Sequence, residues 1–156
     1  MKLLVLSDTH RALGFACEAI EKEHPDAILH LGDHRSDAED LSYAYAQPDW
    51  FYLPGNCDYV PGAAQALTLD FEAVRVFATH GHGYEVKQGL SALCGAAKNA
   101  GAQLALFGHT HQQLLTQRDG LTLLNPGAAG SFGRHGYAVV EFESGTFSCR
   151  LETDTE

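Results

Sequence analysis

The sequence predicts a strand-rich α/β domain with about ten strands and three helices. Short apolar runs, bounded by polar or turn residues, recur along the whole chain. Longer segments between some of them carry apolar residues at helical spacing. A strand, a helix and a second strand follow one another at the start of the chain, which predicts a βαβ unit with parallel strands.

The apolar runs define the strands. Residues 2–6 read Lys-Leu-Leu-Val-Leu, a run typical of a strand covered on both faces. Asp119 and Gly120 form a strong hairpin signal between two later runs. The expected strands are residues 2–6, 26–31, 50–53, 67–71, 74–78, 103–107, 114–117, 121–124, 137–142 and 146–151.

The helical segments have recognisable ends. The first covers residues 13–24 and stops before Pro25. The second is expected to start near residue 37, because residues 36–39 read Ser-Asp-Ala-Glu and form a capping box. The third covers residues 90–97 and gives way to an Asn-Ala-Gly turn.

Length and composition limit the possible functions. The chain has 156 residues, which fits one domain over residues 1–156 with a frayed acidic tail at residues 152–156. Its net charge of −10 argues against binding to long nucleic acid or to an anionic membrane. A small anionic substrate stays possible if bound metal cations reverse the local field.

The cysteines and the chain start predict a cytoplasmic protein. The four cysteines are scattered and form no CxxC pair, so we expect free thiols in a reducing compartment. We see no signal peptide and no apolar segment long enough to span a bilayer. The sequence leaves open whether the protein is a monomer or a homodimer.

Polar side chains gather where the expected strands end. Side chains alternate along an extended chain, so Asp8 and His10 should share one face, as should His109 and His111, whose Cα atoms would lie about 6–7 Å apart. The carboxyl ends of parallel strands are where functional groups collect. Each motif alone could be a solvated turn. Together they supply seven oxygen and nitrogen ligands: Asp8, His10, Asp33, Asn56, His80, His109 and His111.

This ligand set predicts a centre for two divalent metal ions about 3.5–4 Å apart. Carboxylate, imidazole and amide groups without thiolate suit Mn²⁺, Fe²⁺, Ni²⁺ or Zn²⁺ better than a closed structural zinc site. Two divalent ions with Asp8 and Asp33 leave a local charge of about +2, which favours an incoming phosphate despite the acidic chain.

The ordered motifs D-x-H, GD, GN, TH-G-H and GHTH resemble those of the calcineurin-like metallophosphoesterase superfamily. The GNCD and THGH variants, the short chain and the NPG turn resemble its small YfcE-type phosphodiesterase branch. The resemblance implies a metallophosphoesterase fold, a four-layer αββα sandwich of two mixed β-sheets flanked by helices. It also implies that Asp33 bridges two metals, one held by Asp8, His10 and His111 and the other by the remaining three ligands.

The resemblance further implies a dinuclear metal-dependent phosphodiesterase that hydrolyses small phosphodiesters by attack of a metal-bridging hydroxide. Mn²⁺ is the metal we expect first, with Ni²⁺, Fe²⁺, Zn²⁺ or Mg²⁺ as alternatives. We count Asp33 and Asn56 as catalytic as well as metal-binding. The motifs describe the metals and leave the substrate open, so a phosphomonoesterase, a nucleotide pyrophosphatase and a non-catalytic protein-binding scaffold remain alternatives.

Two positions depart from the family pattern. Cys57 stands where many relatives have a histidine that can protonate the leaving group, and a thiol is a poor general acid. His82 is a candidate substitute that could contact the phosphate, or a structural residue. Ser36 stands where relatives often have an acidic residue. The other histidines are expected to be structural or exposed: His24, His30, His34 and His135.

Overall fold

The structure is a computed structural model that describes residues 1–130 and 133–154. The strands are β1 (Lys2–Leu6), β2 (Ala27–His30), β3 (Asp49–Tyr52), β4 (Ala66–Phe71), β5 (Val74–Thr79), β6 (Leu104–Leu106), β7 (Leu114–Arg118), β8 (Leu121–Asn125), β9 (Gly136–Glu143) and β10 (Thr146–Thr153). The helices are α1 (Gly14–Glu23), α2 (Arg35–Ala44), α3 (Ser91–Asn99) and the short 3₁₀ helix η1 (His82–Tyr84).

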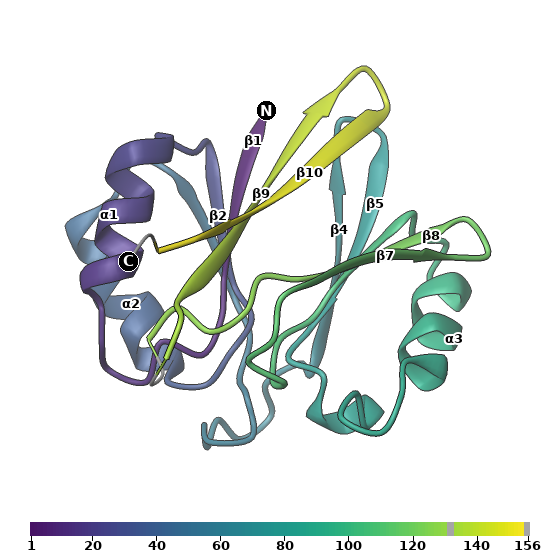
Figure 1. Ribbon diagram of the computed structural model, residues 1–156, viewed down its shortest axis with the longest axis horizontal. Helices are drawn as coiled ribbons and strands as arrows, with labels where there is room; N and C mark the ends of the chain where they lie inside the picture. The colour runs from purple at the N-terminus through teal and green to yellow at the C-terminus, as the bar shows by residue number, and fades with distance from the viewer. Residues whose placement is uncertain (131–132, 155–156) are drawn as a thin grey trace.

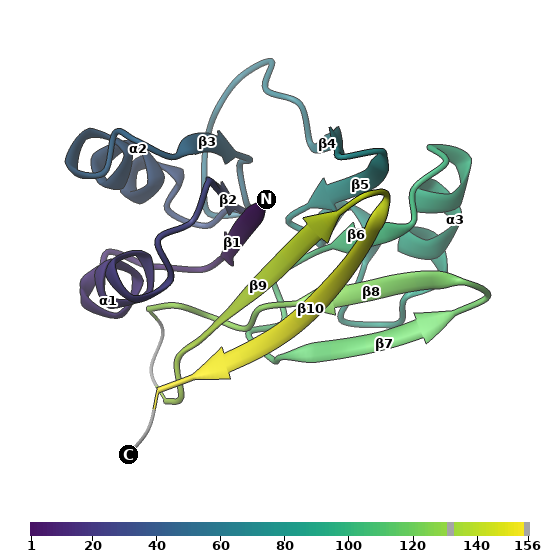
Figure 2. The same cartoon turned by 90° about the horizontal axis from the view of Figure 1, so that it is seen from above.

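The strands form two mixed sheets. The first has the order β10-β9-β1-β2-β3, and the second has the order β4-β5-β6-β8-β7. The strand pairs β1–β2, β2–β3, β5–β6 and β6–β8 are parallel. Helices α1 and α2 cover the outer face of the first sheet and α3 covers the second, as Figures 1 and 2 show. The predicted αββα sandwich is therefore confirmed.

Strand β1 shows why these runs form buried strands. Leu3 and Val5 pack into the core between the sheets, together with Val76 of β5. Leu4 and Leu6 point the other way, into the core that α1 shares with this sheet. Because successive side chains alternate, a continuous apolar run is the pattern that a sheet covered on both faces requires.

The structure corrects three details of the sequence prediction. Helix α2 begins at Arg35, two residues earlier than expected, and Ser36 does not cap it, because no side chain caps this helix and the N-cap residue, His34, has a left-handed backbone. The tail is not frayed at its start, since residues 152 and 153 continue β10 and pair with β9. Residues 155–156 lie outside the described part.

One finding concerns membranes. In residues 1–130 and 133–154, the helices are all too short or too polar to cross a bilayer. The longest, α1 and α2, each have 10 residues. A membrane-spanning helix needs about 20.

Candidate metal centre

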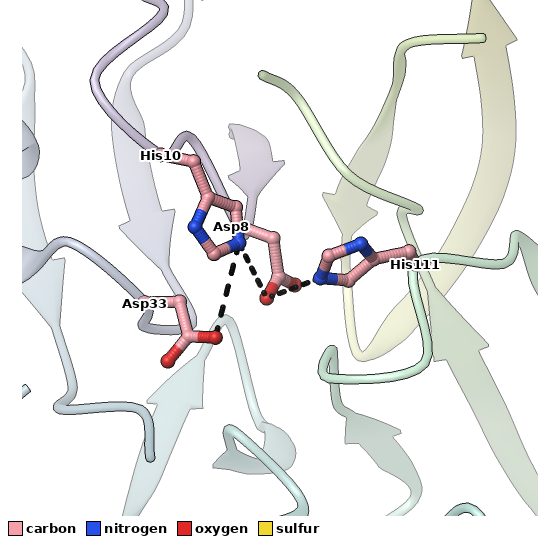
Figure 3. Close-up of side chains that lie close together, drawn as sticks. All are labelled: Asp8, His10, Asp33 and His111. Carbon is pink, nitrogen blue, oxygen red and sulfur yellow. Dashed lines mark ion pairs between the residues drawn. The ribbon is translucent and has the colours of Figure 1, made fainter. Parts of the chain in front are cut away.

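The carboxyl ends of β1, β2, β3, β5 and β6 meet at one edge of the molecule, where their loops come together (Figure 1). Four predicted ligands, Asp8, His10, Asp33 and His111, each offer a donor atom there, and these atoms lie within 4.8 Å of one another. Figure 3 shows the Asp8 carboxylate between the imidazoles of His10 and His111. Residues distant in sequence therefore form one cluster that a metal ion could occupy.

Asp8 is fully buried, and its two carboxylate oxygens have different surroundings. Oδ2 accepts hydrogen bonds from the Ser7 hydroxyl at 2.6 Å and the His109 backbone N–H at 3.2 Å. Oδ1 has no hydrogen-bond partner within residues 1–130 and 133–154. It lies 3.2 Å from Nε2 of His111 and 3.8 Å from Nε2 of His10. One oxygen thus fixes the side chain, and the other faces the centre of the cluster.

Asp33 repeats this division. Its Oδ1 accepts the Cys57 backbone N–H at 2.9 Å, and its Oδ2 lies 3.6 Å from Nε2 of His80 and 3.9 Å from Nε2 of His10. Burial alone would raise the pKa of Asp33, but the hydrogen bond from the Cys57 N–H, with the nearby His80 imidazole, outweighs it, so the pKa lies below its ordinary value. Asp33 is therefore a carboxylate at neutral pH.

His80 and Asn56 show most clearly that a cation is needed. Nδ1 of His80 lies 2.9 Å from the Leu31 carbonyl, which can only accept, so Nδ1 carries a proton. In neutral imidazole Nε2 is then a bare lone pair. Yet Nε2 lies 3.1 Å from Oδ1 of Asn56 and 3.6–3.8 Å from oxygens of the two carboxylates. A positive charge between these atoms, from a metal ion or a proton, would satisfy all of them.

The donor set fits a divalent metal ion by the same reasoning. The buried atoms without a hydrogen-bond partner in the described part include Asp8 Oδ1 and His10 Nε2, both of which point into the cluster. Buried polar atoms are nearly always paired, so two unpaired ligand atoms in one place need an explanation. Carboxylate and imidazole ligands also accept the metals named above.

The backbone brings these side chains together in a way that the sequence argument missed. We expected extended chain and side-chain alternation past the strand ends, and this reason was wrong. Asp8, His10, Asp33, His109 and His111 all have left-handed backbones, with φ between 46° and 69°. Each such non-glycine residue costs of order 1–3 kcal/mol and persists only where its surroundings hold it, as they commonly do at functional sites.

Two glycines permit close approach around the carboxylates. A Cβ on Gly108 would lie 2.1 Å from Oγ of Ser7, and one on Gly55 would lie 2.1 Å from Oδ1 of Asp33. Asn125 braces the same region, donating from Nδ2 to the Gly108 carbonyl at 3.1 Å and accepting the Gly127 N–H at 2.9 Å.

The remaining predicted residues lie on the side of His80. The imidazole centres of His109 and His82 are 5.1 and 5.5 Å from that of His80. Burial, followed by the neighbouring His80, lowers the pKa of both side chains. Nδ1 of His82 is buried and unpartnered in the described part of the chain. Burial and then Asp33 raise the pKa of the Cys57 thiol, so this thiol stays protonated at neutral pH.

Two histidines that we expected to be structural or exposed lie near the centre. The His34 imidazole packs edge-on against His10 with the centroids 5.0 Å apart. His30 is fully buried and bonds to Thr9, between the ligands Asp8 and His10. The location of His34 near the cluster could have been predicted, because it directly follows the ligand Asp33 in the sequence. The burial of His30 follows from its place at the end of β2, inside the sheet.

The cavities add a spatial constraint. One cavity, of about 730 Å³, lies at the opposite end of the first sheet, between the carboxyl ends of α1 and α2. A cavity of about 400 Å³ beside the metal cluster includes Thr110, Lys87 and Leu90 in its lining. A smaller one, of about 110 Å³, is lined by His111, Arg134 and His135 among others. The smaller cavity therefore touches the cluster at His111, and the 400 Å³ cavity meets the same loop at Thr110.

Buried acids and imidazoles that converge in this way can hold a metal ion, and comparison with known proteins shows the family to which the chain belongs. The calcineurin-like phosphoesterase superfamily domain matches residues 1–145. The chain belongs to this superfamily, as its motifs suggested.

Individual relatives and solved structures share 30% or less of their residues with this chain in the three comparisons below. A probable metallophosphoesterase of Mycoplasma pneumoniae is 30% identical over 81% of this chain and 78% of its own. The phosphodiesterase MJ0936 of Methanocaldococcus jannaschii is 24% identical over 81% of this chain and 83% of its own. The crystal structure of Vps29 from Entamoeba histolytica, complexed with zinc, superposes with a TM-score of 0.78 at 17% identity, covering 98% of this chain and 99% of that one. This last likeness concerns the fold alone.

Proposed function

We propose that this protein is a metal-dependent phosphodiesterase that hydrolyses small phosphodiesters. The observation that carries the proposal is the set of buried carboxylate oxygens and bare imidazole nitrogens facing one another. Asp8 Oδ1, Asp33 Oδ2 and Nε2 of His80 lie 3.6–3.8 Å apart in the two pairs that share His80. Acids and bases that a fold leaves without a partner in a polar cluster indicate a ligand site.

We assign Asp8, His10 and His111 to one divalent ion, Asn56, His80 and His109 to a second, and Asp33 to both. The convergence of the first three with Asp33 supports the first assignment. The contact of Asn56 with His80 supports the second. Bound ions would supply positive charge at the phosphoryl oxygens and an activated water for attack at phosphorus. We favour Mn²⁺.

The protein's own groups limit the proton transfers. Asp33 stays ionised and the Cys57 thiol stays protonated at neutral pH, so neither is free to act as a general acid with a matched pKa. His82 is mostly neutral because its pKa is lowered, and we propose that it contacts the phosphate as a hydrogen-bond donor. The leaving alcohol would then take its proton from water, which favours diesters with good leaving groups.

A small phosphodiester is the substrate class we favour. The name of the relative from M. jannaschii, a phosphodiesterase, supports the diester. The net charge of −10 argues against long nucleic acid. We also propose a cytoplasmic location, supported by four free cysteines in the described part of the chain, and either a monomer or a homodimer.

The test compares bis-p-nitrophenyl phosphate with p-nitrophenyl phosphate, using metal-stripped protein titrated with Mn²⁺, Ni²⁺, Mg²⁺ and Zn²⁺. We expect metal to restore activity and the diester to be preferred. The test variant is His111→Ala, in the cluster. Its matched control is His24→Ala, which changes an exposed histidine at the end of α1. A preference for the monoester would make the protein a phosphatase.

The likeness to Vps29 supports one alternative, a protein-binding scaffold of the same fold. A scaffold needs the surface of the fold but no reactive centre. If the protein binds metal ions tightly and hydrolyses neither ester, the scaffold becomes the better account.

A further inference from the structure

A chain of buried polar groups lies beneath the turn that carries Asp8 and His10. Its members are Thr9 in the turn, His30 at the end of β2, and Asp37 in the first turn of α2. Thr9 and His30 are fully buried, and Asp37 is 4% exposed. None of the three is among the predicted metal ligands. Three buried polar side chains from three segments call for a reason beyond packing.

The hydrogen bonds run in one direction. The Gly32 N–H donates to Nδ1 of His30 at 3.1 Å, so the proton of a neutral imidazole lies on Nε2. Nε2 lies 3.0 Å from the Thr9 hydroxyl, to which it donates. That hydroxyl donates to Oδ2 of Asp37 at 2.7 Å. Burial lowers the pKa of His30 to about 4, which keeps the imidazole neutral at neutral pH and the direction unique.

The same carboxylate oxygen also holds the backbone of the turn. The Arg11 N–H donates to Oδ2 of Asp37 at 2.8 Å. Asp8, His10 and Arg11 all have left-handed backbones, with φ of 55°, 46° and 67°. Each left-handed residue costs about 1–3 kcal/mol, so three of them in one turn need to be held by their neighbours. Asp37 is placed to do this, because one oxygen binds both the side chain of Thr9 and the amide of Arg11.

The position of Asp37 argues against an ordinary structural ion pair. Within residues 1–130 and 133–154, no lysine or arginine forms a salt bridge with Asp37. Its Oδ2 bonds instead to groups of the turn, the Thr9 hydroxyl and the Arg11 N–H. Hydrogen bonds to an ionised acceptor are about twice as strong as neutral ones. The Asp37 carboxylate therefore holds the turn and, in the described part of the chain, does not neutralise a basic side chain.

We propose that Asp37 and Thr9, supported by His30, are positioning residues that hold the strained Asp8–His10 turn in the shape that binds metal. The inference rests on the proposed function, because it takes this turn to carry metal ligands. It assigns these residues no contact with the substrate. Removing them would weaken metal binding, because the ligands would have to be ordered again at each binding event.

The main test is Mn²⁺ binding by isothermal titration calorimetry, comparing Thr9→Val with Thr9→Ser. Valine keeps the shape of the side chain and removes the hydroxyl, whereas serine keeps the hydroxyl. We expect Thr9→Val to raise the Kd by about 10–100-fold, as loss of a group that orients a ligand does elsewhere. Thr9→Ser should remain within about threefold of the wild type.

Two controls separate positioning from general loss of stability. Leu93→Ala removes a fully buried side chain of α3, on the far side of the second sheet, so it destabilises the protein without touching the turn. Its Kd should remain that of the wild type. Asp40→Asn removes an exposed carboxylate of α2 that lies outside the chain of groups, and it should also have no effect.

A second readout needs no metal. Exchange of the Arg11 amide hydrogen, followed by NMR in the metal-free protein, should be faster in Asp37→Ala than in the wild type or in Asp40→Asn. If Asp37→Ala does not fold, Asp37→Asn keeps the shape and removes the charge, and faster exchange of the same amide is expected.

The outcomes distinguish this inference from the proposed function. If wild type and Thr9→Val bind Mn²⁺ equally well, the positioning role is wrong while the proposed function stands. If Leu93→Ala raises the Kd as much as Thr9→Val does, the effect belongs to stability and the inference again fails. If the wild type binds no divalent metal, both the inference and the proposed function are wrong.

Discussion

The metal cluster and the Glu23–Arg150 cluster both bury carboxylates, but different groups face them. Glu23, at the end of α1, is 4% exposed and bonds to the Arg150 guanidinium and to the Tyr137 hydroxyl at 2.8 Å. Lys2 adds a second cation at 3.8 Å. The carboxylate of Asp8, in contrast, has one oxygen that accepts no hydrogen bond from the part of the chain that the structure describes.

The difference separates groups that stabilise the fold from groups that await a ligand. The hydrogen bond from Arg150 is the largest influence on Glu23, and the pKa of Glu23 is lowered. This cluster ties α1 to β9 and β10 and is complete as it stands. The metal cluster places acceptors against acceptors, which costs stability unless a cation binds. The contrast can be tested through activity and through stability.

The largest effect should be on activity. In metal-loaded protein, His111→Ala should lose more than about 100-fold in kcat/KM for the diester, since even groups that only orient a ligand cost about 10–100-fold. His24→Ala and Glu23→Gln should keep wild-type activity. Equal activity of His111→Ala and wild type at saturating metal would contradict the assignment of the cluster.

Metal binding should stabilise the protein through the incomplete cluster. At 100 times the Kd, a single bound ion adds about 2.7 kcal/mol to the free energy of unfolding. For a domain of this size that raises Tm by about 5–11 °C. Calorimetric scans with and without Mn²⁺ measure this, and the shift should shrink in His111→Ala but persist in Glu23→Gln.

Breaking the complete cluster should destabilise the protein whether or not metal is present. Glu23→Gln weakens the bonds to Arg150, whose side chain is 41% exposed, so we expect a loss of about 1–2 kcal/mol. Urea unfolding measures it. Glu39→Gln, which removes a half-exposed carboxylate of α2, is the control and should change stability little. An unchanged midpoint for Glu23→Gln would show that the buried pair contributes nothing.

In the metal cluster, replacing a carboxylate should instead raise the free energy of unfolding of the metal-free protein. Asp8→Asn replaces a buried charge and offers an amide N–H to the imidazole lone pairs, so metal-free protein should gain about 0.5–2 kcal/mol. The gain should disappear when Mn²⁺ is added to both proteins, because the variant loses a ligand. If metal-free Asp8→Asn is instead less stable than the wild type, the Asp8 carboxylate has a compensation that the contacts do not show.

The smallest effect concerns pH. The pKa of Glu23 is lower in the folded than in the unfolded chain, where it is near the ordinary 4.5. The unfolded state therefore binds the proton first as pH falls. The contribution of Glu23 should be complete above about pH 4.5 and lost progressively below it. Chemical unfolding in metal-free protein from pH 6 to 3 should show a shallower decline for Glu23→Gln than for wild type.

The two regions also differ in how far the sequence predicts them. The metal motifs are local and ordered along the chain, so pattern and resemblance were enough to select Asp8, Asp33 and His111. No local pattern marks Glu23, which bonds to residues more than 110 positions away in the sequence. Its partners come from β9 and β10, and only sheet pairing brings them to the end of α1.

Some errors came from applying strand geometry to turns. Alternation put Asp8 with His10 on one face, and they do converge, but through left-handed backbones that a residue pattern does not indicate. The capping box at residue 36 failed for a related reason. Asp37, the next residue, is held by the Thr9 turn, and the helix starts before Ser36. In both places tertiary hydrogen bonds outweighed local preference.

The sequence by itself determined the strand-rich α/β class, the strand ends where polar residues gather, and the family, whose resemblance implied the two sheets. It could do so because apolar runs, glycine turns and ligand types are local properties of the chain. The tertiary structure decided which oxygen of each carboxylate is free, which histidine nitrogen is bare, and which buried groups hold the ligand turn. Those properties depend on hydrogen-bond partners from distant segments, and folding alone brings such partners within bonding distance.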